Sequence, residues 1–526
     1  MPLGRPGGHF DLLAMTDSNL YTALRTGFPA DLDAIAIETA DTGTPLHYTW
    51  RDLDRGTAML ANLIDSLALP ADSRIAVQTG KSVEALMLYL AVLRAGHVYL
   101  PLNPAYQASE LEYFIGNAEP AVVVCAGADF GWVGKLAFKA GTRHVYTLNE
   151  DRSGTLLDRA AFQGDEHRPA VRGAGELAAI LYTSGTTGRS KGAMLTHGNL
   201  LSNARVLHSE WGWNAGRDVL IHALPLFHVH GLFVAAHGAL LSGSRMIWFS
   251  RFDARAVVER LPEASVFMGV PTLYVRLLAE PSFTRQTCRL MRLFISGSAP
   301  LLTETFNAFR ERSGHTILER YGMSETVMLT SNPYRPEGAR RGGTVGLPLP
   351  GVRVRVHDDK GRPLPAGETG GLEVKGPNVF KGYWRMPEKT ADEFTTDLWF
   401  KTGDVGRIDD DGYITIVGRS KDLIISGGYN VYPAEVEGYL NDMPGVAESA
   451  VVGVPHGDFG EAVVAIVVAR AGTALDTAAM VAVLKAQIAN FKVPKQVFVV
   501  AELPRNAMGK VQKNLLRDEH RGLFAR

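Results

Sequence analysis

The chain has 526 residues, of which 46% are hydrophobic and 21% charged, so it can bury a large core and has the composition of a soluble globular protein. Lys and Arg number 54 against 55 Asp and Glu, and this net charge of -1 excludes a broad field for nucleic acid or an anionic membrane. No apolar run approaches the roughly 20 residues of a membrane span. The only two cysteines, Cys125 and Cys288, lack C-x-x-C spacing, which excludes a disulfide framework and predicts a reducing, cytoplasmic location.

The first third of the chain has an α/β pattern. Helical periodicity over Arg51–Leu67 and Val83–Ala95 alternates with short apolar strands at Arg74–Val77 and Ala121–Cys125. We therefore expect a sheet covered by helices in this region.

A short apolar strand, Leu177–Tyr182, leads directly into a Gly/Ser/Thr loop, Thr183–Gly192. Its glycines let the backbone approach a ligand, its hydroxyl groups can donate to phosphate oxygens, and Lys191 adds a cation. The loop has neither the Walker A pattern nor the G-x-G-x-x-G of a dinucleotide fold. Taken alone it would often be a plain surface turn, but its place after a buried strand favours a phosphate-binding loop.

The pattern changes twice in the second half of the chain. Another α/β stretch covers residues 218–330, and residues 343–417 form short β segments with many Gly and Pro turns, which indicates a small barrel or a curled sheet. The remainder mixes helices with strands in an α+β pattern. We predict a disordered leader at 1–14, a large domain at 15–420 made of two α/β subdomains and a small β-barrel-like subdomain, and a smaller α+β domain at 421–526.

Five motifs occur in an order that resembles the adenylate-forming (AMP-binding) enzyme superfamily. The phosphate loop resembles its signature loop, and the four others are Tyr321–Thr326, Thr402–Asp404, Gly418–Asp422 and Pro504–Lys510. The resemblance covers nearly the whole chain. It implies an acid:CoA ligase that uses ATP, Mg²⁺ and CoA, with a mobile C-terminal domain that rotates about a hinge at Lys421.

The resemblance also implies roles for individual residues. Lys510 is the expected catalytic lysine, Glu325 the Mg²⁺ ligand, Thr326 a contact near the α-phosphate, and His228 a further residue at the reacting centre. The expected contacts to ATP and CoA are Thr183, Ser184, Gly185, Thr186, Thr187, Lys191, Ser298, Ala299, Pro300, Glu319, Arg320, Tyr321, Gly322, Met323, Ser324, Asp404, Arg419, Lys421, Gly427 and Gly428.

Elementary chemistry supports these roles. A carboxylate is a poor acyl donor, and its attack on the α-phosphate builds negative charge that needs preorganised cations. Asp404 can accept from both ribose hydroxyls, and Tyr321 offers a flat face to adenine. Lys510 lies far along the chain from the phosphate loop, so its use requires the small domain to close over the large one. Gly427 and Gly428 can leave room for the pantetheine arm of CoA, or can simply form a turn.

A helical run at Val270–Leu278 is apolar on almost every side, which predicts a buried helix. Its odd member, Arg276, is expected to be buried and to need an anionic partner. That partner is either a structural carboxylate or a second carboxylate on the substrate. Residues 222–232, 293–301 and 378–390 resemble malonyl-CoA synthetases, which implies malonate as the acid, methylmalonate as a second acid, and Arg276, His228 and Ser298 as pocket residues.

Other functions are open to the same sequence. A sibling ligase would take acetate, an aryl acid or a medium-chain fatty acid. Amino-acid adenylation is disfavoured because no carrier domain is expected after Lys510, so the acceptor thiol would arrive on a separate molecule. A luciferase-like oxygenase would share the first step, and a catalytically inactive nucleotide sensor is disfavoured because Lys510, Glu325 and Asp404 are all present. Acylation of Lys510 would remove the charge that the first step uses, which is a regulatory hypothesis.

Overall fold

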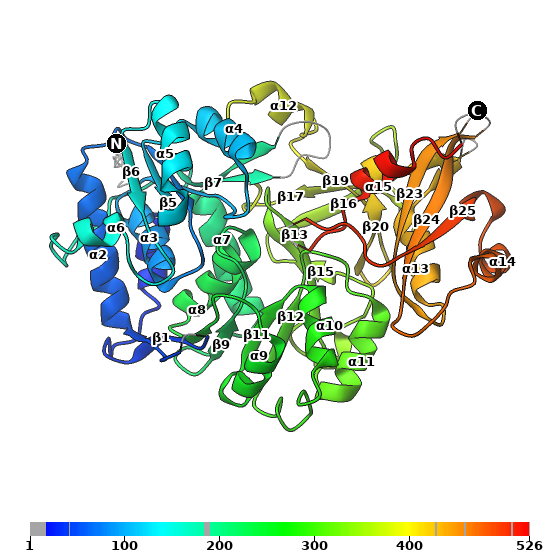
Figure 1. The fold of residues 1–526 in the computed structure, drawn as a ribbon, viewed down its shortest axis with the longest axis horizontal. Helices are drawn as coiled ribbons and strands as arrows, with labels where there is room; N and C mark the ends of the chain where they lie inside the picture. The colour runs from blue at the N-terminus through cyan, green and yellow to red at the C-terminus, as the bar shows by residue number, and fades with distance from the viewer. Residues whose placement is uncertain are drawn as a thin grey trace, which may run out of the picture.

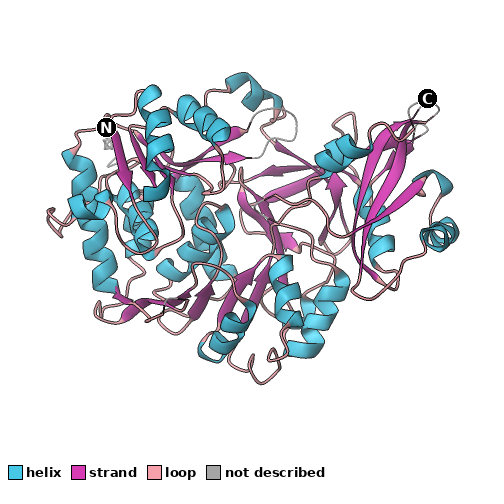
Figure 2. Cartoon of the chain, in the orientation of Figure 1, coloured by secondary structure: helices cyan, strands magenta, loops and turns pink. Residues whose placement is uncertain are grey.

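The computed structural model describes residues 17–41, 43–183, 190–426, 429–456, 459–506 and 509–524. Two α/β sheets and a small antiparallel sheet make up the large N-terminal part, and a separate α+β unit follows it (Figures 1 and 2). This unit, orange to red in Figure 1, lies at the opposite end of the molecule from the N-terminus. The predicted fold class is confirmed, whereas the predicted leader at 1–14 lies outside the described residues.

The first α/β sheet has seven strands, in the order β18 (Gly382–Tyr383), β8 (Lys191–Thr196), β7 (Leu177–Thr183), β4 (Val98–Pro101), β3 (Arg74–Gln78), β5 (Val122–Cys125) and β6 (His144–Thr147). The strands from β7 to β6 are parallel. The associated helices are α2 (Trp50–Ser66), α3 (Val83–Arg94), α4 (Ala108–Ala118), α5 (Phe130–Lys139) and α6 (Thr155–Ala160).

Local sequence explains where two of these helices begin. Helix α2 starts at a capping box in which Thr49 and Asp52 satisfy each other's backbone N–H groups, and α3 starts after the N-cap Ser82. Helix α3 is buried on every side. The predicted ranges of both helices are confirmed to within one residue at each end.

The second α/β sheet has nine strands, in the order β15 (Leu347–Pro348), β14 (Val327–Ser331), β13 (Leu318–Met323), β12 (Leu293–Ser296), β11 (Val266–Gly269), β9 (Val219–His222), β10 (Arg245–Trp248), β1 (Ile35–Thr39) and β2 (His47–Thr49). Its six central strands, β13 to β1, are parallel. The helices of this region are α1 (Leu20–Arg25), α7 (His197–Glu210), η2 (His230–Ala236), α8 (His237–Leu241), α9 (Ala254–Arg260), α10 (Pro271–Ala279) and α11 (Thr303–Ser313). Open parallel sheets bind ligands beyond the carboxyl ends of their strands, so the segments after β9, β11, β12 and β13 are the places to search.

The expected barrel-like subdomain is a four-stranded antiparallel sheet, in the order β16 (Arg353–His357), β17 (Gly370–Lys375), β19 (Phe400–Ile408) and β20 (Ile414–Arg419). Among the described residues no ladder joins β16 to β20, so the curled-sheet alternative is the better description. The sheet is small because Gly and Pro turns interrupt its strands. The predicted domain boundary at 420/421 falls in η5 (Ser420–Asp422) and stays a prediction.

The C-terminal unit is built on a five-stranded sheet, with β22 (Tyr429–Val431), β21 (Ile424–Ser426), β24 (Gly460–Ala469) and β23 (Val446–His456) in order and β25 (Gln496–Val500) paired with β24. Its helices are α13 (Pro433–Asn441), α14 (Thr477–Gln487) and α15 (Lys513–His520). Two hydrophobic clusters, one on each face of the sheet, give this unit its own core.

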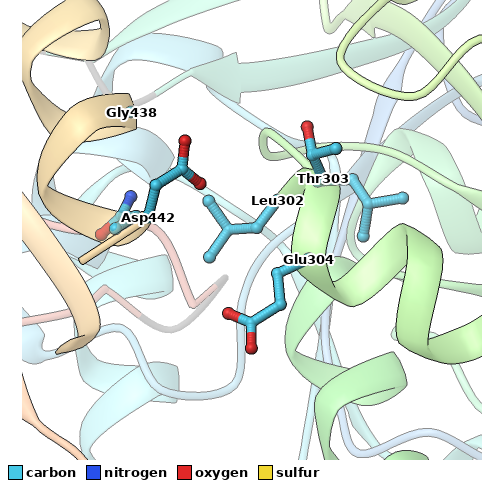
Figure 3. Close-up of a pocket in the computed structure, with 7 residues that line it drawn as sticks. Leu302, Thr303, Glu304, Gly438 and Asp442 are labelled. Carbon is cyan, nitrogen blue, oxygen red and sulfur yellow. The ribbon is translucent and has the colours of Figure 1, made fainter. Parts of the chain in front are cut away.

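The two parts of the chain meet at a cleft (Figure 3). Leu301, Leu302, Thr303 and Glu304 line it from the large part, and Gly438, Asn441 and Asp442 line it from α13. Beside it Glu304 accepts from Arg470 of the C-terminal unit at 2.5 and 2.6 Å. This ion pair is exposed, and exposed pairs contribute at most about 1 kcal/mol to stability. It therefore holds the two parts together only weakly.

In the described ranges, no helix combines the length and the apolar character needed to cross a bilayer.

Candidate active site

The described ends of the phosphate loop face each other across a strand pair. Thr183 ends β7, Lys191 begins β8, and the two residues are register partners. The predicted contacts Ser184, Gly185, Thr186 and Thr187 lie outside the described residues.

Lys191 is held by groups that the sequence did not reveal. Its Nζ lies 3.3 Å from Oε1 of Glu393, directly after α12 (Pro387–Asp392), and 4.3 Å from the ring centroid of Tyr383. Glu393 also forms an ion pair with Lys389, whose Nζ lies 3.0 Å from Oε1 of Glu393. Lys191, the predicted phosphate-binding cation, is thus paired with Glu393, which lies 202 residues away in sequence, and no local pattern indicates this contact.

Tyr383 joins Lys191 to Glu325, because its hydroxyl donates to Oε1 of Glu325 at 2.9 Å. Glu325 is buried, and burial raises the pKa of its carboxyl despite this hydrogen bond. Next to it, the hydroxyl of Thr326 is buried and has no partner. Buried polar atoms are normally hydrogen-bonded, so Glu325 and Thr326 form a site that a ligand would complete.

These two residues fit a Mg²⁺ ion that is shared with phosphates. Within the described ranges, no three His, Cys, Asp or Glu side chains are grouped to hold a metal by themselves. Mg²⁺ is typically bound through one or two carboxylates together with substrate phosphates and water. A single buried carboxylate such as Glu325, with an unpaired hydroxyl beside it, suits that mode.

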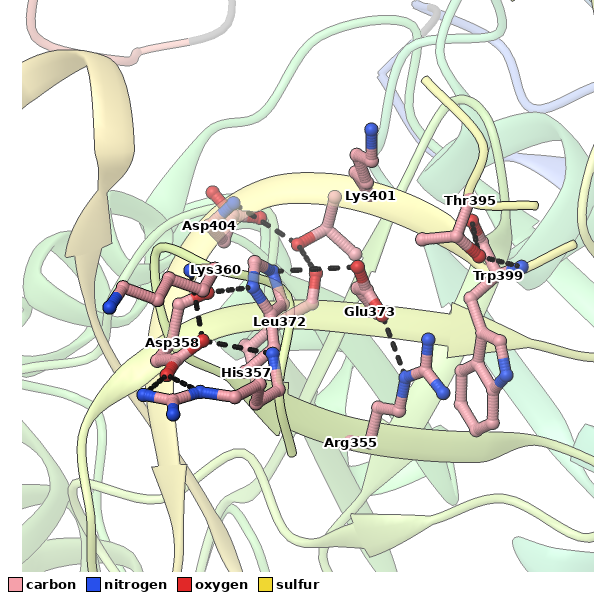
Figure 4. Close-up of polar contacts among 12 residues, drawn as sticks. Arg355, His357, Asp358, Lys360, Leu372, Glu373, Thr395, Trp399, Lys401 and Asp404 are labelled. Carbon is pink, nitrogen blue, oxygen red and sulfur yellow. Dashed lines mark hydrogen bonds and ion pairs between the residues drawn. The ribbon is translucent and has the colours of Figure 1, made fainter. Parts of the chain in front are cut away.

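The carboxylate of Asp404 lies in a hydrogen-bonded network on β19. Its Oδ2 accepts from the hydroxyl of Tyr321 and its Oδ1 lies 3.0 Å from Nε of Arg419. The backbone N–H of Asp404 donates to the hydroxyl of Thr402 at 3.1 Å, and that hydroxyl donates to the carbonyl of Leu372 at 2.9 Å. Figure 4 shows Asp404 and Leu372 of this network beside the Arg355–Glu373 pair of the same sheet. Asp404, Tyr321 and Arg419 are therefore brought together, as the resemblance implied.

A second group of site residues lies beyond the carboxyl ends of β9 and β12 and within the neighbouring strand β13. Ser298, with φ of +72°, follows β12, and its hydroxyl lies 3.4 Å from Nδ1 of His230. The guanidinium of Arg320 packs against Gly297, where an added Cβ would lie 2.5 Å from Cζ. A left-handed conformation at a residue other than glycine is strained, and such strain concentrates at functional sites.

This second group contains several buried polar atoms without a partner: Ser296 Oγ, His230 Nε2, Glu319 Oε2, and Arg320 Nε and Nη2. Burial lowers the pKa of Arg320 to about 9, so its guanidinium is still charged at neutral pH. Burial raises the pKa of Glu319 to about 8, and its Oε1 accepts from the N–H of Leu301 at 3.2 Å. Glu319 thus supports the loop after β12, whereas Arg320 is a buried cation with two unused donors.

Lys510 reaches this region from the C-terminal unit. Its backbone forms a tight turn with Asn506, whose side chain accepts from the Lys510 N–H at 3.0 Å. The neighbouring Gly509 approaches α10, since an added Cβ would lie 3.8 Å from Oγ1 of Thr272. Burial, chiefly, and the nearby Arg419 lower the pKa of the Lys510 amine. The expected closure of the small domain over the large one is the arrangement that the structure has.

His228 lies close to the positive charges of Lys510 and Arg320. Burial is the main reason that its pKa falls to about 3, and the charges of Lys510 and Arg320 add to the effect. The imidazole is therefore neutral at physiological pH. Lys510, Arg320 and His228 lie close enough to influence one another although their motifs are far apart in sequence.

The predicted burial of Arg276 is wrong. Helix α10 buries Leu273, Tyr274 and Leu277 and exposes Val275 and Arg276. Three apolar positions at i, i+1 and i+4 make one buried stripe, and Arg276 lies on the other side of the helix. Its role toward a substrate stays a prediction, and no structural carboxylate pairs with it within the described ranges.

The other predicted residues fall into three places. Ala299 and Pro300 continue the loop after Ser298, and Gly322, Met323 and Ser324 lead from β13 to Glu325. Lys421 lies in η5, where burial and Arg419 lower the pKa of its amine to about 8. Gly427 and Gly428 lie outside the described residues.

Comparison with known proteins identifies the family. The model for AMP-binding enzymes matches residues 28–384, and the model for the AMP-binding enzyme C-terminal domain matches residues 435–510. The chain therefore belongs to the AMP-binding enzyme family.

Several individual members of this family are similar to the chain over most of its length. ATP-bound MatB from Rhodopseudomonas palustris is 51% identical, with 97% of this chain and all of that chain covered at a TM-score of 0.93, whereas apo MatB at the same identity gives 0.82. A malonate–CoA ligase of Arabidopsis thaliana is 35% identical over 85% of this chain and 78% of its own length. A feruloyl-CoA synthase of an Amycolatopsis species is also 35% identical, over 90% and 94%.

Proposed function

We propose that this chain is an ATP-dependent malonate:CoA ligase, which forms malonyl-AMP and pyrophosphate and then malonyl-CoA and AMP. Relatives named malonate–CoA ligase and the likeness to MatB support this function. The observation in the chain itself that carries the choice of acid is the buried guanidinium of Arg320, two of whose nitrogen atoms have no partner.

Malonate suits Arg320 because it carries a second carboxylate. A buried charge without a partner is costly, and a guanidinium binds a carboxylate through two parallel hydrogen bonds. Neutral His228 and the Ser298 hydroxyl add hydrogen-bonding groups without adding a competing charge. Acetate, a fatty acid or ferulate would leave Arg320 unpaired, whereas methylmalonate would pair with it and is the natural second acid.

The first step requires no covalent participation by the protein. One carboxylate oxygen of malonate attacks the α-phosphorus of ATP, the bond from that phosphorus to the bridging oxygen breaks, and pyrophosphate leaves with the electron pair. We assign to Lys510 the neutralisation of charge on the α-phosphate, with the Thr326 hydroxyl as a donor beside it. Asp404 would accept from the ribose, and Lys191 would bind the pyrophosphate that leaves. Glu325 would hold Mg²⁺, whose positive charge would offset the negative charge of the phosphates.

The second step needs a different arrangement of the same residues. The CoA thiol loses its proton, its sulfur attacks the acyl carbon, and the bond to the AMP oxygen breaks so that AMP leaves. The closed position of Lys510 and the higher TM-score to ATP-bound than to apo MatB support assignment of this structure to the first step. We propose that the C-terminal unit then rotates about Lys421 and brings the segment around Gly427 and Gly428 to the site.

A cytoplasmic location is part of the proposal. Both cysteines, Cys125 and Cys288, are buried and unpaired, and burial raises the pKa of each thiol to about 12, which suits a reducing compartment. Some of the related malonate–CoA ligases are named mitochondrial. Fractionation of cells that express the chain would decide between the two compartments.

The role of Arg320 can be tested by its replacement with Met, which fills the space without charge. Removing one partner of a buried charge pair costs about 2–5 kcal/mol, so the KM for malonate in ATP–pyrophosphate exchange should rise at least about 30-fold. The KM for ATP should change little. Arg310→Met, at an exposed arginine of α11, is the matched control and should leave both KM values unchanged. An unchanged KM for malonate in Arg320→Met would contradict the choice of acid.

The Lys191–Glu393 pair predicts that one substitution will lower a KM, in this case the KM for ATP. Lys191 must leave Glu393 to reach a phosphate, so Glu393→Gln should lower the KM for ATP about two- to fivefold, the range of a partly exposed ion pair. Glu388→Gln, an exposed carboxylate on the same helix α12, should leave it unchanged. If the KM for ATP rose in Glu393→Gln, Glu393 would orient Lys191 toward ATP instead of withholding it.

A further inference from the structure

Lys81, directly after β3, makes polar contacts that none of the proposed steps uses. Its Nζ donates to the carbonyl of His222 at 2.8 Å and to the carbonyl of Phe249 at 2.6 Å, and it lies 3.0 Å from Nδ1 of His222. It also lies 4.3 Å from the ring centroid of Trp248. Within the described ranges no carboxylate forms an ion pair with it, and burial lowers the pKa of its amine well below the ordinary value.

These contacts link the two α/β sheets. Lys81 follows a strand of the seven-stranded sheet, whereas His222 and Phe249 end or follow β9 and β10 of the nine-stranded sheet. Lys81 thus caps the carboxyl ends of two strands in the other subdomain. Its amine donates to the carbonyl of Phe249 and to that of His222, which also accepts from the N–H of Phe249 at 3.1 Å.

Lys81 and the carbonyl of Gly231 together fix the proton position on His222. Nε2 of His222 lies 2.9 Å from the carbonyl of Gly231, which can only accept, so Nε2 carries a proton. Burial lowers the pKa of His222 well below its ordinary value, so the ring is neutral and its Nδ1 accepts from Lys81. The ring is stacked on Trp248 at 4.6 Å between centroids. His222 is therefore fixed in tautomer and in orientation.

Gly231 belongs to the first turn of η2, a π-helix, a form often found at functional sites. There is no room for a side chain at this position, since an added Cβ would lie 2.0 Å from the carbonyl oxygen of Pro225. The same turn carries His230, which approaches Ser298, and the N–H of Leu232 donates to the carbonyl of His228 at 3.0 Å. The contacts thus run from Lys81 through His222 and Gly231 to the residues of the proposed acid pocket.

We infer that Lys81 and His222 are positioning residues for acid binding: they anchor the first turn of η2 and so place His228 and His230 around the acid. The inference rests on the proposed function for the identity of the acid. Neither residue touches the reacting atoms. Their loss should therefore act on the KM for the acid, with kcat and the KM for ATP nearly unchanged.

Substitutions at His222 separate positioning from simple packing. His222→Gln retains an N–H donor near the place of Nε2, whereas His222→Asn retains only the atom near Nδ1 and His222→Leu retains neither. We expect His222→Asn and His222→Leu to raise the KM for malonate about tenfold, which is less than the largest loss that misplaced binding groups can cause. For His222→Gln the KM should stay within about twofold of that of the unsubstituted protein. Lys81→Met should raise the KM for malonate as much as His222→Leu does. The matched control is Lys139→Met, at an exposed lysine of α5.

The measurement is ATP–pyrophosphate exchange at varied acid and at varied ATP, with thermal unfolding to confirm that each variant is folded. Equal KM values for malonate in the Gln, Asn and Leu variants, or parallel rises in the KM for both substrates, would overturn the inference. If Lys81→Met does not fold, the three His222 variants still decide. If the unsubstituted protein does not activate malonate, the proposed acid is wrong, and the same comparison is made with the acid that supports exchange.

Discussion

Buried positive charge is the constraint on which the site depends. Arg320 is buried with two nitrogen atoms that have no partner, the Lys510 amine is buried near cations and carboxylates of the large part, and His228 is kept neutral mainly by burial. Burying charge that is not fully paired lowers the stability of the folded protein. The arrangement is explained by ligands that bring negative charge, ATP with its phosphates and an acid with two carboxylates.

The fold brings the site residues together from several directions. In the nine-stranded sheet β12 ends just before Ser298 and the neighbouring β13 carries Arg320, and the antiparallel sheet brings Asp404 against Tyr321. Lys510 comes from the C-terminal unit, on a turn whose Gly509 lies close to α10. Because the ion pair between Glu304 and Arg470 is exposed and weak, closure can be reversed, as a two-step reaction with one movable lysine requires.

Sequence patterns predicted the fold class and, through motifs such as Tyr321–Thr326, named residues that the structure brings together and whose roles stay predictions. They could not predict which residues pair across long separations. Glu393 and Tyr383 beside Lys191, and Lys81 beside His222, come from segments about 140 to 200 residues apart, and neither partner has a distinctive neighbourhood. Arg276 failed for a different reason: an apolar run that is rich in every direction does not show which side faces the core, and the exposed Val275 beside Arg276 made the helix seem more buried than it is. The β character of residues 343–417 was predicted, but turn spacing alone does not reveal whether a ladder closes the sheet into a barrel.

The most direct test of the account is the separation of the two half-reactions in a Lys510→Ala protein, with Lys495→Ala, an exposed lysine of the same unit, as control. Loss of a preorganised cation at a developing phosphoryl charge costs about 10²–10³ in rate. We expect formation of the acyl adenylate from ATP and malonate to fall by that factor, whereas transfer of a supplied malonyl adenylate to CoA is retained. Adenylate formation at the normal rate in Lys510→Ala would contradict the account.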